Sequence, residues 1–396
     1  MNKYFRLFAS VGFSMALVAA TVLLSVPSTM AQCSEVISGL RRPLGITQSN
    51  QNNLIVSETG TLGELHSGRI SIVDPGGSRR TLLSGLPSAT SDVGEPSGPS
   101  GVYLRGRTLY VVIGVGNTFL PSGIPNPNPS SPIFSSLLAI HFSANVEKRT
   151  SGFTLSFAHQ QALAAGEQVR LSNGGGDKVT IELVANFPDF TPNPLPFFQP
   201  NIRISNPFDL VAVGNQLYVT DGGMNLVWQV DINSGAFSAL ATFPPIRNPL
   251  FGTIGGPFIQ AVPTGIAYSD GQLLVTLFTG FPFPPGASVV EQIDPLTGDH
   301  APFITGLKTA IDVLPITEGG DTDYLVLQHS SGPGPFFSGP GLLLRFETPS
   351  APPSVIANCL SRPTSMTLDE KTGTLYVTEL TTMPSNGRIV AIPVAP

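Results

Sequence analysis

The sequence is poor in the residue types that most catalytic and metal-binding motifs require. Its 396 residues include two cysteines, five histidines and one tryptophan, and only 12% of them are charged. Two cysteines allow one disulfide and are too few for a structural zinc site. No Gly-x-Ser-x-Gly, His-Glu-x-x-His or phosphate-loop motif occurs, so these absences remove the common signatures of hydrolases, zinc proteases and nucleotide-binding enzymes.

Positive charge is also scarce. The chain has 20 Lys and Arg against 26 Asp and Glu, a formal net charge of −6. Nucleic-acid binding relies on a basic surface, so no nucleic-acid partner is expected. Beyond the first thirty residues, no apolar run is long enough to span a membrane.

Turn-forming and apolar residues are abundant instead. The sequence contains 42 Gly and 38 Pro, and 41% of its residues are hydrophobic. Few charges combined with many turn-formers favour short strands joined by loops over helices with charged faces. The composition therefore predicts an all-β protein with a sizeable core.

The N-terminus has the pattern of an export signal. Lys3 and Arg6 precede an apolar run from Leu7 to Val26, and the small residues before Gln32 suit a signal peptidase. We expect residues 1–31 to be a signal peptide and the exported chain to be periplasmic or extracellular, with no membrane span after the signal is removed. A retained N-terminal anchor is the alternative, because the run is about long enough to cross a bilayer.

A repeated unit runs through the rest of the chain. Each unit opens with a motif like Pro-x-small-apolar and continues into further short strands without helical periodicity. The six openings are Pro43-Leu44-Gly45-Ile46, Pro99-Ser100-Gly101-Val102, Pro207-Phe208-Asp209-Leu210, Pro263-Thr264-Gly265-Ile266, a degenerate Thr309-Ala310-Ile311-Asp312, and Pro363-Thr364-Ser365-Met366. Four strands per unit predict a six-bladed β-propeller forming one domain over residues 32–396.

The spacing of the units predicts one insertion and one closure. The second opening is 108 residues from the third, so we expect an insertion in blade 2 at about residues 143–183, forming an extra hairpin or extended outer strands. The last unit lacks a fourth strand, whereas Glu35–Leu40 looks like a fourth strand without a unit before it. Pairing the two closes the ring and removes exposed edges. Cys33 lies just before one predicted outer strand and Cys359 at the end of another, consecutive one. Whether they pair remains open, because strand start and strand end can lie too far apart.

Several segments are distinctive enough to suggest a family. Gln260–Ile266, Phe278–Gly286, Asn206-Pro207-Phe208, Tyr218–Asn225 and Ile70–Pro75 resemble the ScyD/ScyE family of bacterial propellers. That family is named after gene clusters for scytonemin, an indole-phenol pigment. The resemblance implies an exported six-bladed propeller related to NHL-repeat and gluconolactonase-like proteins, and it implies no particular reaction. The sequence departs from the family pattern at the insertion, at the fifth opening and at Thr276-Leu277, where an acid is missing.

Polar residues at the ends of the second strands are the first candidate site. Glu58, Asp221, His329 and Glu379 are expected to ring one mouth of the central channel. Carboxylate oxygens converging there would suit Ca²⁺, so Glu58, Asp221 and Glu379 are the metal candidates. His329 is the candidate base for a metal-dependent hydrolase or lactonase. In the structural alternative, each acid caps the loop of its own repeat by accepting backbone N–H groups.

The second candidate site is apolar. Long loops rich in Phe and Pro are expected on the same face, at Asn117–Phe134, Phe190–Phe198, Phe243–Pro263, Thr279–Pro285 and Gly332–Pro340. The ligand-binding candidates in these loops are Phe251, Phe258, Phe281, Phe283, Phe336 and Phe337. Clustered exposed aromatics mark ligand or partner sites, and the alternative is that the rings pack on one another and cover the channel.

The leading hypothesis is therefore binding rather than catalysis. We expect a monomer that binds an apolar or aromatic small molecule, or a protein partner, on its Phe-rich and Pro-rich loops, with a link to scytonemin-type pigment synthesis implied by the resemblance. The calcium-dependent lactonase is the alternative. A pyrroloquinoline-quinone sugar dehydrogenase also uses a six-bladed ring, but no matching His-Arg signature occurs.

Overall fold

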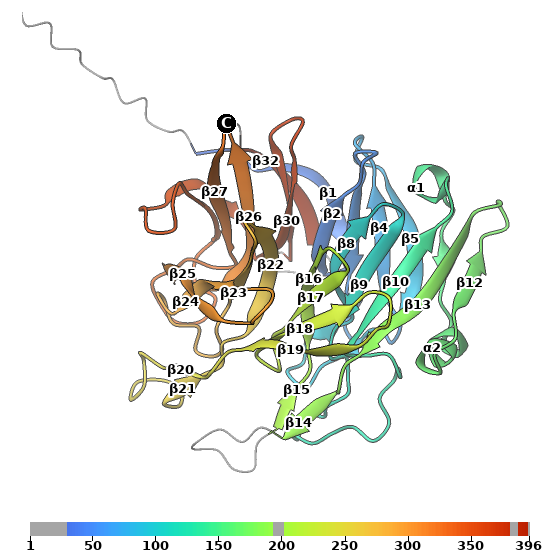
Figure 1. Cartoon of the computed structure of the whole chain (residues 1–396), viewed down its shortest axis with the longest axis horizontal. Helices are drawn as coiled ribbons and strands as arrows, with labels where there is room; N and C mark the ends of the chain where they lie inside the picture. The colour runs from blue at the N-terminus through green and yellow to red at the C-terminus, as the bar shows by residue number, and fades with distance from the viewer. Residues whose placement is uncertain (1–29, 193–201, 381–386, 395–396) are drawn as a thin grey trace, which may run out of the picture.

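Most of the chain forms antiparallel β-sheets arranged around a central axis (Figure 1). The computed structural model describes residues 30–192, 202–380 and 387–394. Nearly all of the expected signal peptide lies outside these residues, so its cleavage and the export of the chain stay predictions. In the described part of the chain, no helix is both long and apolar enough to cross a membrane.

The six blades each contain four strands in antiparallel order. The innermost strands are β2 (Pro43–Gln48), β8 (Pro99–Arg105), β16 (Pro207–Val213), β22 (Pro263–Ser269), β26 (Ala310–Glu318) and β30 (Pro363–Asp369). The second strands are β3 (Leu54–Glu58), β9 (Thr108–Ile113), β17 (Gln216–Asp221), β23 (Gln272–Leu277), β27 (Asp321–Gln328) and β31 (Thr374–Glu379). The third strands are β4 (Gly68–Val73), β10 (Ser136–Phe142), β18 (Leu226–Asp231), β24 (Ser288–Ile293), β28 (Gly341–Phe346) and β32 (Gly387–Pro393). The outer strands are β5 (Arg79–Leu86), β13 (Lys178–Asn186), β19 (Phe237–Thr242), β25 (His300–Leu307), β29 (Ser354–Leu360) and β1 (Ser34–Leu40).

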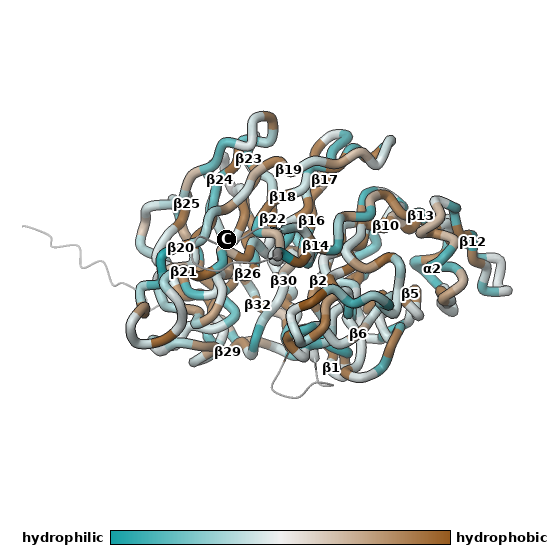
Figure 2. The backbone as a smooth tube through the Cα atoms, turned by 90° about the horizontal axis from the view of Figure 1, so that it is seen from below, coloured by the Kyte–Doolittle hydropathy of each residue, from teal (hydrophilic) through white to brown (hydrophobic). Residues whose placement is uncertain are grey.

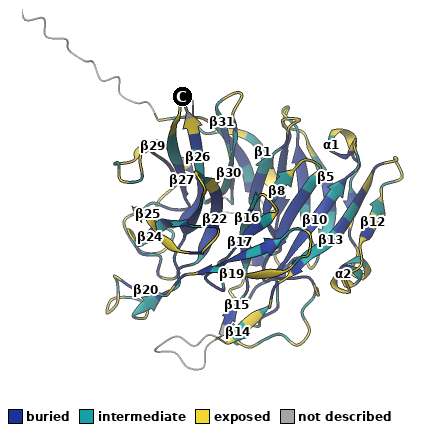
Figure 3. Ribbon diagram, in the orientation of Figure 1, coloured by how far each residue is buried: buried dark blue, intermediate teal, exposed yellow. Residues whose placement is uncertain are grey.

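The innermost strands form a closed ring. Each contacts the next, from β2 through β8, β16, β22, β26 and β30 back to β2. Figure 2 shows inner strands near the centre of the view and β12 (Val169–Ser172) and β29 near its edge. A separate cluster of buried apolar side chains fills each of the six junctions between blades, so the strands are the most buried part of the molecule (Figure 3). The expected six-bladed propeller is confirmed.

The N-terminal strand closes the ring as expected. β1 pairs antiparallel with β32, the third strand of blade 6, so the first and last strands of the chain lie in one sheet. This pairing supplies the fourth strand that the last repeat lacks, and it leaves blade 6 with the same four-strand layout as its neighbours.

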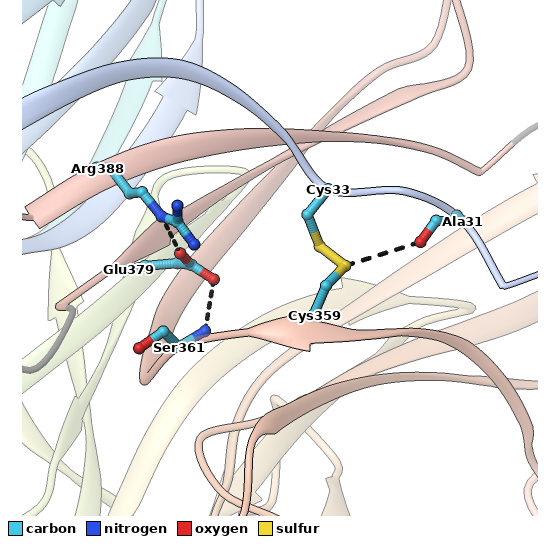
Figure 4. Close-up of a disulfide and its surroundings, with 6 residues drawn as sticks. All are labelled: Ala31, Cys33, Cys359, Ser361, Glu379 and Arg388. Carbon is cyan, nitrogen blue, oxygen red and sulfur yellow. Dashed lines mark hydrogen bonds and ion pairs between the residues drawn. A yellow bond between two sulfur atoms is a disulfide. The ribbon is translucent and has the colours of Figure 1, made fainter.

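A disulfide joins the closing strand to blade 5. Cys33 and Cys359 are bonded, with Cα atoms 6.0 Å apart (Figure 4). The sequence left this pairing open because strand start and strand end were expected on opposite faces. The backbone N–H of Ala31 donates to the carbonyl of Ile356 at 2.8 Å, so the segment before β1 runs beside β29 and brings the two cysteines together.

The repeated Pro-x-Gly motif is explained by the close packing of the inner strands. A Cβ atom added at Gly101 would lie 2.5 Å from the Cα of Asp209 on the next blade, and one at Gly265 would lie 2.6 Å from the Cα of Asp312. Residues larger than glycine would overlap the neighbouring backbone at these two positions. Glycine in these blades therefore makes room for the aspartate of the following blade.

The insertion in blade 2 contains helices that the sequence did not indicate. α1 (Val146–Arg149) and α2 (Phe157–Ala164) precede β12, which pairs with β13, and β11 (Phe153–Thr154) adds in parallel to β5 of blade 1. The hairpin of β12 and β13 is of the kind expected, and β13 itself is the fourth strand of the blade. The buried residues of α2 are Gln160 and Leu163, so no stripe of apolar residues signals this helix.

Removing the disulfide should destabilise the propeller without changing its fold. The two cysteines are 326 residues apart in the sequence. The bond therefore excludes many conformations of the unfolded chain, which lowers its entropy and favours the folded state. We expect the double variant Cys33→Ser, Cys359→Ser to lose roughly 4 kcal/mol of unfolding free energy. Thermal unfolding followed by circular dichroism measures this, with the reduced wild type as the matched control. An unchanged midpoint in both samples would show that the bond does not stabilise the ring closure.

Candidate functional site

The acids at the ends of the second strands are engaged within their own blades. Glu58 is fully buried, and Arg69 donates to its two carboxylate oxygens at 2.8 and 2.7 Å. The backbone N–H of Arg41, just before β2, donates to the same carboxylate at 2.6 Å. The acid thus fixes the loop that enters its own blade.

Glu379 repeats this arrangement in blade 6. Its side chain is fully buried, accepts from the backbone N–H of Ser361 at 2.7 Å, and pairs with Arg388 Nε at 2.5 Å (Figure 4). Burial raises the pKa of Glu379, while the N–H of Ser361 and the Arg388 guanidinium act in the opposite direction.

Asp221 caps the corresponding loop of blade 3. One carboxylate oxygen accepts from the backbone N–H groups of Asn206, Gly223 and Met224 at 2.7, 3.2 and 2.9 Å. The other accepts from the Ser205 hydroxyl at 2.6 Å and from Trp228 Nε1 at 3.1 Å. These five donors leave both oxygens satisfied, although burial raises the pKa of Asp221.

His329 is one residue beyond the equivalent position in blade 5. The register pairs Pro43 with Glu58 and Ala310 with Gln328, so Gln328 takes the place of the acid. Its Oε1 atom accepts from the backbone N–H of Lys308 at 2.6 Å, as the acids do elsewhere. Grouping His329 with the acids was therefore a misalignment by one residue, caused by the degenerate opening of this repeat.

The contacts of His329 are those of a packed side chain. Its Nδ1 atom lies 2.9 Å from the carbonyl oxygen of Pro363, and because a carbonyl only accepts, Nδ1 carries the proton. The ring packs against those of Phe278 and Phe337, whose centroids are 5.7 and 5.1 Å away. Burial lowers the pKa of His329 to about 4, so the ring is neutral at pH 7 and weakly basic.

These contacts do not fit a shared calcium site. Glu58, Asp221 and Glu379 belong to blades 1, 3 and 6, and each uses its oxygens on donors of its own loop. Among the described residues, no group of three or more His, Cys, Asp or Glu side chains could hold a metal ion. The geometry agrees with the structural alternative, in which a repeated acid serves the repeat.

Two carboxyl groups that the sequence analysis did not select lie on the inner strands. Asp209 of β16 accepts from the backbone N–H of Ile266 on blade 4 at 3.2 Å, and Asp312 of β26 accepts from that of Met366 on blade 6 at 2.8 Å. Burial raises the pKa of Asp209 to about 7. Burial, followed by the charge of Asp209, raises the pKa of Asp312 well above its usual value. The sequence did contain a signal for these two acids: each occupies the third position of the repeat opening, where the other blades have Gly or Ser.

Part of the aromatic set packs into its own core. Phe283 and Phe337 are half-buried with ring centroids 4.4 Å apart, and both lie against Phe278 at 5.9 and 5.8 Å. The guanidinium of Arg362 lies 4.9 Å from the Phe337 ring centroid. Phe258, on the short strand β21 (Phe258–Ile259), is also half-buried. For Phe283 and Phe337, packing of rings on one another is the observed role.

The remaining aromatic candidates are exposed. Phe281 follows β23 in blade 4 and Phe336 follows β27 in blade 5, and their ring centroids lie 5.6 Å apart. Phe281 is 53% exposed and Phe336 47%. Phe251, in the loop between β20 (Ile246–Arg247) and β21, is 62% exposed, and Gly255 of that loop approaches the Phe281 ring. Phe197 and Phe198, in the expected loop at Phe190–Phe198, lie outside the described residues.

A pocket at the channel mouth was not anticipated from the sequence. It has a volume of about 260 Å³ and lies over the starts of three inner strands, at Leu44, Ser100 and Phe208. The connection formed by β6 (Ala89–Thr90) and β7 (Pro96–Ser97) borders it and contributes Asp92. Burial raises the pKa of Asp92. Phe208 also packs against the cluster that contains Phe278, so the pocket and the aromatic loops share an apolar side chain.

Comparison with known proteins identifies the fold and no closer relationship. No protein-family model and no curated protein matches the chain. The PQQ-bound aldose sugar dehydrogenase of Streptomyces coelicolor superposes with a TM-score of 0.50 at 12% identity, covering 92% of this chain and 97% of that chain. A glucose dehydrogenase-type putative oxidoreductase of Thermus thermophilus gives 0.49 at 13%, with 91% and 99% covered, and a gluconolactonase of Xanthomonas campestris gives 0.49 at 11%, with 92% and 90% covered.

Likeness at this level of identity concerns the fold alone. The chain is a six-bladed β-propeller whose fold is like that of the aldose sugar dehydrogenase. The ligands of those proteins carry no information about this one, because propellers support unrelated functions.

Neutralising Glu379 tests whether the repeated acids are caps or metal ligands. Glu379→Gln leaves Arg388 beside a neutral amide, and we expect a loss of about 3 kcal/mol in unfolding free energy. The loss should be the same in chelator and in millimolar Ca²⁺. Glu370→Gln, an exposed acid on the turn at the other end of β31, is the matched control and should have no effect. A calcium-dependent rise in the wild-type melting midpoint that Glu379→Gln removes would instead identify a metal site.

The pair on the inner strands predicts a pH dependence of stability. The pKa of an ordinary aspartate in the unfolded chain is near 3.8, whereas that of Asp209 is about 7 in the fold. Below about pH 4, the buried neutral acid makes its full contribution to the free energy of unfolding. As the pH rises toward 7 the unfolded chain releases protons that the fold retains, so this contribution is lost. His329 acts in the opposite direction, because its lowered pKa costs stability as the pH falls from 6.5 toward 4.

Melting midpoints at about pH 5.5 and pH 8 measure this effect. Asp209→Asn and Asp312→Asn replace each acid with a neutral side chain of the same shape. The midpoint of each variant relative to wild type should rise by a few degrees between the two pH values. Asp299→Asn, an exposed acid, is the control. Variant differences that are equal at both pH values would show that neither carboxyl titrates in this range.

Proposed function

We propose that this protein binds a flat apolar or aromatic small molecule on the exposed rings of Phe281 and Phe336. The carrying observation is that two half-exposed rings from neighbouring blades lie 5.6 Å apart at the loop-rich face. Keeping two such rings in water is unfavourable unless a ligand covers them. An aromatic ligand would bury ring surface against both and gain stacking contacts.

Hydrogen bonds and packing fix the loops that carry these rings. This supports a binding role for the exposed rings. Lys308 is buried, and its Nζ atom donates to the carbonyls of Gly332 and Gly334 at 2.7 Å each and to Ser338 at 2.9 Å. Phe336 has a positive φ of 62°, which a bulky residue rarely adopts. Rings fixed before binding lose little entropy when a ligand arrives.

Backbone conformations disfavoured for L-residues gather in the same region. Val262 and Thr279 are β-branched and have φ values of 55° and 74°. Such conformations each cost of order 1–3 kcal/mol and occur most often at functional sites. Phe283, two residues after Phe281, also has a positive φ, of 56°. The surrounding packing therefore stabilises a loop shape that the chain would not adopt alone.

A small molecule suits this surface better than a protein partner does. Three partly exposed rings, including Phe251, offer on the order of 300 Å² of apolar area. A stable protein interface buries about 800 Å² on each side. The pocket of about 260 Å³ at Phe208 lies on the same face and provides a recess of small-molecule size.

We further propose that the chain acts outside the cytoplasm, after removal of residues 1–31, and that it belongs with the ScyD/ScyE propellers. In that setting the ligand would be an indole or phenol precursor of a scytonemin-type pigment. The calcium-dependent lactonase is not proposed, because Glu58, Asp221 and Glu379 are each engaged in loop caps.

Binding of a neutral fluorescent aromatic dye, N-phenyl-1-naphthylamine, tests the proposed surface. We expect saturable binding by wild type and at least a tenfold loss of affinity in the double variant Phe281→Ala, Phe336→Ala, since each ring contributes about 1 kcal/mol or more of apolar contact. Indole and p-cresol should compete with the dye.

A matched control removes a ring of similar exposure elsewhere. Phe157 on α2 is 46% exposed, so Phe157→Ala should leave dye affinity unchanged. Equal affinity in wild type and the double variant would refute the ring surface, as would equal losses in the double variant and Phe157→Ala. Circular dichroism melts confirm that the variants are folded.

A further inference from the structure

A second, chemically different pocket lies at the outer edge of blade 1. It has a volume of about 510 Å³ and is lined mainly by polar atoms. Residues from three parts of the chain surround it: the segment before β2, the β3–β4 loop with β4 and β5, and the insertion from blade 2. Its size lies within the range of small-molecule sites, well above the room that a bare inorganic ion needs.

Positive charge is concentrated at this pocket, in a protein with a formal charge of −6. Arg41 and Arg69 line it, and Arg79, which is not part of the lining, lies 3.9 Å from Glu58. Glu58 is the only buried carboxylate in this group, and Arg69 occupies both of its oxygens. The guanidinium groups of Arg69 and Arg79 thus share one buried carboxylate, Arg41 adds a third positive charge to the lining, and the exposed Glu64 is the other acid that lines the pocket.

Two observations show that this positive charge is not balanced. In the described part of the chain, the Arg41 guanidinium makes no hydrogen bond or ion pair, although its backbone N–H bonds to Glu58. Burial lowers the pKa of Arg79, and repulsion from Arg69 and Arg41 adds to this effect while Glu58 opposes it. An anion placed in the pocket would relieve this repulsion and give Arg41 a partner.

The rest of the lining provides neutral hydrogen-bonding groups. The hydroxyls of Ser84 and Thr154 lie 3.2 Å apart across the β5–β11 pair, and Ser151 is exposed beside them. His66 also lines the pocket, and burial lowers its pKa. Such groups can bind the hydroxyls of a ligand.

We propose that the blade 1 pocket binds a small hydroxylated organic anion, of the class of sugar acids and sugar phosphates. Arg41 binds the anionic group, with Arg69 contributing to the positive field, and the hydroxyl-bearing side chains of β5 and the insertion bind the sugar hydroxyls. The site depends on the insertion, because Ser151–Thr154 form one of its walls. It is independent of the aromatic surface proposed above.

Calorimetric titration at constant ionic strength tests this site with four probes: glucuronate, glucose 6-phosphate, glucose and inorganic phosphate. We expect at least one sugar anion to bind and glucose not to bind. The two sugar anions distinguish a carboxylate from a phosphate preference. Inorganic phosphate should bind at least tenfold more weakly than the better sugar anion, because it cannot reach the hydroxyl groups.

Three variants locate the binding. Arg41→Gln should lower the affinity for the sugar anion at least tenfold while leaving the Glu58–Arg69 pair intact. Ser151→Trp fills the pocket without changing charge and should abolish binding. Arg170→Gln, an exposed arginine on β12, makes the same charge change elsewhere and should have no effect.

Several outcomes would overturn the proposal. These are no binding of either sugar anion at 20 mM, equal binding of glucose, phosphate affinity equal to that of the better sugar anion, unchanged affinity in Arg41→Gln, or an equal loss in Arg170→Gln. Thermal melts of each variant, without ligand, establish that lost binding is not lost folding.

Discussion

The close approach of six inner strands around one axis is the constraint on which the rest of the molecule depends. At Gly101 and Gly265 the neighbouring backbone is so close that these two positions have no space for a side chain. Polar groups brought so close must be bonded across the junctions between blades. Hydroxyl groups on the inner strands do this at three junctions, where Ser100, Thr264 and Thr364 donate to a carbonyl of the following blade at 3.1, 3.3 and 2.9 Å.

Asp209 and Asp312 perform the same task with carboxyl groups. Each accepts a backbone N–H from the blade that follows, so the two acids connect blade 3 to blade 4 and blade 5 to blade 6. The glycine of the preceding blade provides the space that each acid needs. The ring is thus held by short polar contacts near the axis, by apolar clusters farther out, and by the β1–β32 pairing with its disulfide at the periphery.

The same geometry determines which side chains are available to bind a ligand. Because every blade must begin its inner strand at one face, the acids at the ends of the second strands are used to fix those entry loops, as with Glu58, Asp221 and Glu379. The long loops of blades 4 and 5 then provide rings rather than charges at that face. On blade 1, arginines lie around Glu58, which caps the entry loop. The insertion from blade 2 forms one wall of a pocket at this charged edge.

The sequence by itself determined the fold, since a four-strand unit repeated six times with an N-terminal fourth strand leaves little freedom in how a ring closes. It also located the aromatic loops, and it identified the acids while leaving their role open between capping and metal binding. Only the tertiary structure decided between these roles, because the partners of Asp221 come from two separate loops and those of Glu58 from β4 and the segment before β2. Four other features likewise depend on which strands lie side by side: the one-residue offset at His329, the disulfide, the pairing of Phe281 with Phe336, and the pocket at Arg41. The order of residues along the chain does not give the distances between strands that are far apart in sequence.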